Sequence, residues 1–118
     1  MARQTKLMSA GTSATQAGAI VGDVQATLVL AGSTAADATR ITGECVLMTS
    51  GTGGAILPSS TKGDTYLLKN ESGATCTLYP PTGATINATT SLSMATAKSV
   101  VVFFTSATAC HTIPTVAT

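Results

Sequence analysis

Charged and aromatic side chains are scarce in this sequence. Of its 118 residues, 9% are charged and 3% are aromatic, and tryptophan is missing. Six Lys and Arg stand against five Asp and Glu, which leaves a formal net charge of +1. A groove that follows a phosphate backbone needs clustered Lys and Arg, and no short stretch of the chain is strongly basic. The sequence therefore argues against nucleic acid as a partner.

Long hydrophobic runs are missing as well. The longest mostly apolar stretch, residues 17–31, is interrupted by glycines and by Asp23 and Gln25, whereas a membrane-spanning helix needs about 20 apolar residues. The N-terminus carries Arg3 and Lys6 with no apolar run after them, so it does not resemble a signal peptide. We expect no membrane partner and synthesis in a cytoplasm.

Cysteine is too sparse for a disulfide framework. Cys45, Cys76 and Cys110 are odd in number and far apart, which fits neither paired disulfides nor a C-x-x-C metal or redox motif. We expect all three to lie buried in strands as small apolar residues.

No catalytic group of residues is apparent. The single histidine, His111, directly follows Cys110, and adjacent residues in a strand point to opposite faces, so the two cannot act together as base and nucleophile or as metal ligands. The carboxylates are isolated from one another, and the glycine-rich run 51–54 lacks the Lys-Ser/Thr of a phosphate loop. The sequence predicts no enzyme activity, no cofactor and no metal.

Small residues take the place of the missing types. Thr, Ala, Ser and Gly make up more than half of the chain, and an alanine buries much less apolar area than a leucine or a phenylalanine. The core of one copy is therefore thin, and burial of surface between identical subunits would add stability. We expect a homo-oligomer, with a homotrimer favoured.

The chain divides into two regions near residue 40. Between residues 20 and 28 an apolar residue recurs at helical spacing, but Gly18 and Gly22 disfavour a helix. The alternative, which we favour, is an extended N-terminal arm over 1–40. It would contain a short strand over 25–30 and a helical turn over 34–37 capped by Ser33.

Residues 41–118 alternate short β-prone runs with turns, as is typical of an antiparallel sandwich or barrel. Runs 65–70 and 75–79 surround a four-residue turn and predict a hairpin, with Cys76 and Leu78 sharing one face. Run 100–105 is apolar on both faces and predicts a central strand. Further β-prone runs are 44–49, 55–57, 85–87 and 110–113. The expected fold is all-β, a jelly-roll-like antiparallel β-sandwich or barrel over 41–118 with an extended N-terminal arm.

One pattern within this region has a family resemblance. It consists of an apolar run ending in proline at 55–58, the segment 62–70, Gly-Ala at 73–74 and the segment 78–87 with its Pro-Pro and Pro-Thr-Gly turn. In this order the residues resemble small virion structural proteins of tailed bacteriophages, over roughly residues 50–114. The final strand of that pattern often carries tryptophan, and this chain has His111 there. The resemblance implies a binding surface without catalysis.

The resemblance, together with the expected layout of an N-terminal arm and a β-sandwich, favours a capsid decoration (cement) protein. Such a viral protein binds and stabilises the lattice of the major capsid protein, is made in the bacterial host cytoplasm and resides on the capsid surface of the virion. Arg3, Lys6 and Leu7 in the arm are the predicted partner-binding residues. One alternative is a head-fibre, collar or tail-associated structural protein. A more distant alternative is a small carbohydrate-binding module, whose sugar-stacking surface would use Tyr79 alone or with Tyr66.

Overall fold

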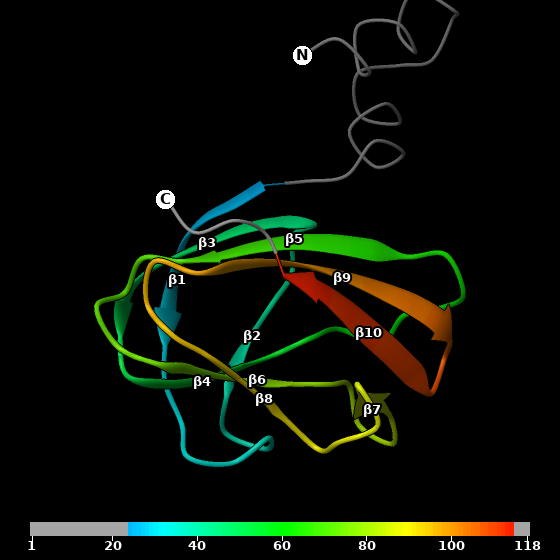
Figure 1. The fold of residues 1–118 in the computed structure, drawn as a ribbon. Helices are drawn as coiled ribbons and strands as arrows, with labels where there is room; N and C mark the ends of the chain where they lie inside the picture. The colour runs from blue at the N-terminus through cyan, green and yellow to red at the C-terminus, as the bar shows by residue number, and fades with distance from the viewer. Residues whose placement is uncertain (1–23, 115–118) are drawn as a thin grey trace, which may run out of the picture.

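The structure, a computed structural model, describes residues 24–114 of the chain. This part forms two β-sheets and contains no helix (Figure 1). The prediction of an all-β fold is confirmed. The strands are β1 (Val24–Leu30), β2 (Thr39–Arg40), β3 (Cys45–Gly51), β4 (Gly53–Ile56), β5 (Thr65–Asn70), β6 (Cys76–Tyr79), β7 (Thr85–Ile86), β8 (Leu92–Met94), β9 (Ser99–Ser106) and β10 (Ala109–Pro114).

The first six strands wind as a β-solenoid. The larger sheet has the order β1-β3-β5-β9-β10-β7 and the smaller one β2-β4-β6-β8. β1, β3 and β5 pair in parallel, and so do β2, β4 and β6. Strand pairs β1–β2, β3–β4 and β5–β6 are therefore three stacked coils, each of which visits both sheets. The predicted antiparallel jelly-roll-like sandwich or barrel is wrong, because these strands pair with the next coil instead of with their neighbours in sequence.

After the third coil the chain reverses its winding. β8 pairs antiparallel with β6, and β9 pairs antiparallel with β5. The fourth layer thus passes through the smaller sheet before the larger one. β10 then forms a hairpin with β9, and β7 pairs in parallel with β10. The edges of the larger sheet are β1 and β7, and those of the smaller sheet are β2 and β8.

The predicted hairpin of 65–70 and 75–79 is a coil corner. Both strands exist, as β5 and β6, and Cys76 and Leu78 are fully buried on one face as predicted. The strands nevertheless lie in different sheets. A polar turn between two strands with alternating apolar residues suits a corner as well as a hairpin.

The other predicted strands appear as β3, β4, β7, β9 and β10, and β9 is central in its sheet as expected. The short β2 and β8 were not predicted. Of the predicted arm, residues 24–40 hold β1 and β2 and belong to the two sheets, and residues 1–23 lie outside the described part. The predicted helical turn near 34–37 is a plain turn, in which Asp37 Oδ1 accepts hydrogen bonds from the backbone amides of Ser33 and Thr34.

The hydrophobic core lies between the two sheets. Every coil contributes, as does β9: Leu28 and Leu30 come from β1, Met48 from β3, Leu68 from β5, and Val102 and Phe104 from β9, all at most 2% exposed. Among residues 24–114, no helix is long and apolar enough to cross a membrane.

Candidate interaction surface

An apolar row crosses the outer face of the six-stranded sheet. Val24 pairs with Cys45, Cys45 with Leu67, Leu67 with Val101 and Val101 with Ile113. Residues paired in neighbouring strands point to the same face. Val24, Leu67 and Ile113 are 57%, 51% and 54% exposed, Cys45 is exposed and Val101 half-buried. We call these five residues the apolar row.

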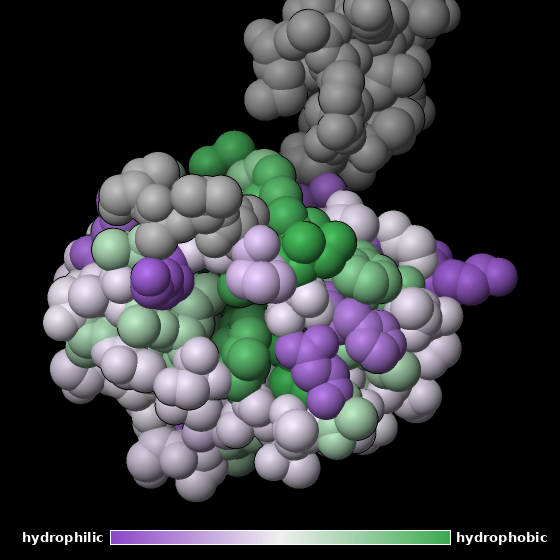
Figure 2. Space-filling model, in the orientation of Figure 1, coloured by the Kyte–Doolittle hydropathy of each residue, from purple (hydrophilic) through white to green (hydrophobic). Residues whose placement is uncertain are grey.

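This arrangement differs from scattered surface hydrophobics. Single exposed apolar side chains are normal, whereas contiguous ones mark interaction sites. Three of the four large hydrophobic residues that are exposed in the described part belong to the row. Figure 2 shows hydrophobic surface running over the strands of the larger sheet at the top of the view. A shallow depression lined by Cys45, Leu47, Leu67 and Val101, among others, lies within it.

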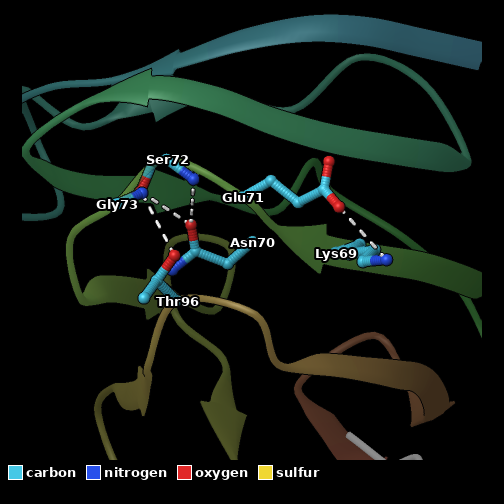
Figure 3. Close-up of polar contacts among 6 residues, drawn as sticks. All are labelled: Lys69, Asn70, Glu71, Ser72, Gly73 and Thr96. Carbon is cyan, nitrogen blue, oxygen red and sulfur yellow. Dashed lines mark hydrogen bonds and ion pairs between the residues drawn. The ribbon is translucent and has the colours of Figure 1, made fainter. Parts of the chain in front are cut away.

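Charge on this face is low. Lys69 lies two residues along β5 from Leu67, and its Nζ is 3.2 Å from Glu71 Oε1 (Figure 3). Both side chains are about half exposed, so this ion pair adds little stability. Aromatic rings also lie on this face: Phe103 and His111 pair across β9 and β10 with their ring centroids 5.7 Å apart.

The corner that holds Lys69 and Glu71 is fixed by Asn70, whose side chain points inward (Figure 3). Asn70 is fully buried. Its Nδ2 donates to the carbonyl oxygens of Ala74 (2.8 Å) and Met94 (2.9 Å), and its Oδ1 accepts from the backbone amide and hydroxyl of Ser72. Gly73 N also donates to Thr96 Oγ1 at 3.1 Å. These bonds tie the β5–β6 corner to the β8–β9 turn and give the outer face a rigid edge.

One cysteine lies on the outer face of the larger sheet, and the other two lie in the core. Cys76 and Cys110 are fully buried, as predicted, and burial raises the pKa of each thiol to about 11. The prediction is wrong for Cys45, which is exposed. Its position in β3 alternates with buried Val46 and Met48, so its side chain lies on the outer face.

The two tyrosines offer little for a sugar-stacking surface. Tyr66 is 7% exposed, and its hydroxyl shares a 2.6 Å hydrogen bond with Ser60 Oγ. Burial raises its pKa. Tyr79 is half-buried, its hydroxyl donates to the carbonyl oxygen of Ser33, and its ring lies over Gly54. Neither ring is a freely exposed platform.

No group of three or more His, Cys, Asp or Glu residues that could hold a metal ion occurs within 24–114. The predicted partner-binding residues Arg3, Lys6 and Leu7 lie outside the described residues. The apolar row itself was missed at the level of sequence. Its members are separated by 12 to 34 residues and meet only through strand pairing, so no local pattern signals them.

Comparisons with known proteins add no relative. No protein-family model, no curated protein and no solved structure matches the chain.

Proposed function

We propose that this protein is a non-catalytic structural protein that acts through surface contact, and specifically a capsid decoration protein of a tailed bacteriophage. The apolar row carries the first part of the proposal. A face with five apolar residues in register across five strands is suited to association. The capsid assignment rests on the sequence resemblance over residues 50–114.

The proposed partners are the major capsid protein and further copies of this chain. A β-solenoid presents flat sheet faces that need no induced fit, which suits repeated attachment to a lattice. The net charge of +1 makes apolar and hydrogen-bonding contacts the main source of affinity.

The test is the copy number of this chain relative to the major capsid protein in gradient-purified virions, measured by quantitative mass spectrometry. Hundreds of copies per particle would support decoration of the capsid surface. A handful would replace this proposal with a head-fibre, collar or tail-associated component, since such sites are few. Absence from the particle would refute a virion role altogether.

A further inference from the structure

The apolar row is centred on β5. Leu67 lies on the third of the five strands that carry the row. Its neighbours on either side are Cys45 and Val101, and Val24 and Ile113 occupy the ends. With strands about 4.8 Å apart the row is about 19 Å long.

We propose that this face binds a second copy of the same chain, through a two-fold axis that runs along the row. A two-fold contact uses the same patch on both subunits, so each residue of the row then meets its own counterpart. Leu67 contacts the second copy's Leu67 at the centre. This inference names the partner of the apolar row and therefore rests on the first part of the proposed function, surface association, but not on the capsid assignment.

The position of Lys69 favours this axis over a two-fold axis that runs along the strands. Lys69 and Thr65 lie on the outer face at either side of Leu67 along β5. An axis along the strands would place Lys69 against the second copy's Lys69, and like charges in contact are unfavourable. An axis along the row places Lys69 against the second copy's Thr65, which removes the repulsion.

A second copy is a better occupant than a charged partner or the chain's own first residues. The face offers one lysine, already paired with Glu71 at 3.2 Å, so a partner recognised by charge finds little to bind. Residues 1–23 contain few large apolar side chains, too few to cover five strands. A second copy of this face supplies a matching apolar row, and in the proposed arrangement its Lys69 does not lie against the Lys69 of the first copy.

The area predicts a weak contact. Strands of about seven residues span about 23 Å, so the face measures on the order of 400 Å² per copy, about half of a standard interface contribution. Association is therefore expected to depend on concentration between about 10 µM and 1 mM. The predicted homotrimer would require a different, heterologous contact.

The experiment is sedimentation equilibrium of the full-length chain over that range, with Leu67→Lys as the test and Ser93→Lys as the control. Ser93 is exposed on β8 of the other sheet, so the control adds the same charge elsewhere. We expect dimers for the unchanged protein and the control, and at least a tenfold weaker association for Leu67→Lys. Because Leu67 is half exposed, the variant should keep its far-UV circular dichroism spectrum.

A second measurement does not depend on that variant and uses Cys45, which lies on the proposed axis, one strand away from Leu67 at its centre. At high protein concentration a short bis-maleimide should link two chains through Cys45, and alkylation of Cys45 by iodoacetamide should slow. A Cys45→Ser variant provides the blank. A monomer at all concentrations, a trimer, or a dimer indifferent to Leu67→Lys would overturn the proposal. Any of these results leaves the copy number in virions, and hence the capsid proposal, to be decided separately.

Discussion

At the scale of single residues, Asn70 concentrates more hydrogen bonds than any other side chain of its corner. It is fully buried between two turns, and its amide serves both as donor and as acceptor. An aspartate has nearly the same shape, but it lacks the NH₂ group that donates to the carbonyl oxygens of both Ala74 and Met94. The carbonyl groups of Ala74 and Met94 would then face a carboxyl oxygen in the interior.

We predict that Asn70→Asp lowers the free energy of unfolding by about 2–4 kcal/mol, because buried acceptors lose their donor and a charge is buried. Asn87→Asp is the matched control. Asn87 is exposed and bonds to Thr112 Oγ1 and to the backbone amide of Thr112, so its replacement should cost less than about 1 kcal/mol. Urea unfolding followed by circular dichroism measures both. Equal losses would contradict the role of Asn70.

The thiols provide a second prediction at this scale. Cys45 is exposed, whereas Cys76 and Cys110 are buried and have pKa values raised from 9.0 to about 11. The thiolate is the reactive form. At pH 8, Ellman's reagent should therefore react rapidly with one thiol in the dilute folded protein and with all three after denaturation. Fast reaction of a second thiol in the folded protein would disagree with the burial.

The same pKa shifts make stability depend on alkaline pH. In the unfolded chain the two thiols ionise near 9, and in the folded protein they stay protonated until about 11. The unfolded state therefore loses protons first, and stability falls as pH rises from about 9 to 11. Buried Tyr66, whose pKa is also raised, acts in the same direction. Urea midpoints at pH 8 and pH 10.5 test this, and Cys76→Ala should reduce the difference.

At the scale of elements, the stacking of coils depends on close backbone approach. Gly53, at the start of β4, has φ of 119°, and a Cβ there would collide with the carbonyl oxygen of Gly32 in the first coil. Gly63 has φ of 95° but no atom within 4 Å of the same position. A comparison of alanine substitutions at the two glycines therefore separates the cost of backbone strain from the cost of a steric collision between coils.

We predict that Gly63→Ala costs about 1 kcal/mol of stability, from the left-handed backbone conformation alone. Gly53→Ala should cost at least about 2 kcal/mol more, because the backbone of the first coil cannot move aside without disturbing β1 and β3. Thermal unfolding of the two variants gives the comparison. Equal melting temperatures would mean that the coils do not approach as closely as described.

At the scale of the whole molecule, the first coil is part of the folded unit. β1 pairs along β3, and its Leu28 and Leu30 are each 2% exposed in the core. Leu57 and Ile41 of the following segments share that core. The boundary of the folded unit thus matters for any truncation used to study binding.

We expect deletion of residues 2–32 to destabilise the protein far more than deletion of residues 2–23. The longer deletion removes β1, exposes core residues of β3 and loses two buried leucines, each worth about 2–5 kcal/mol when truncated. Melting temperatures followed by circular dichroism compare the two. If the two deletions melted alike, β1 would not contribute to the core.

Much of the fold follows from the sequence because its signals are local. β-Prone runs bounded by turn residues located β5, β6, β9 and β10. Alternation of apolar and polar residues in the run 75–79 placed Cys76 and Leu78 on one buried face, since a strand's two faces differ every second residue. The two- and three-residue strands β2 and β8 carry too few positions to show such alternation. They form because the longer strands beside them present unpaired backbone groups.

The sequence by itself therefore determined that residues 24–114 are all-β, where the longer strands lie and that Cys76 and Leu78 face inward. Tertiary structure alone decided which strands pair and in which direction, because the same turn serves a hairpin or a coil corner. It also decided the apolar row, whose members come from five separate strands. Pairing depends on the burial and hydrogen bonding of segments far apart in the chain, and no local pattern of residues contains that information.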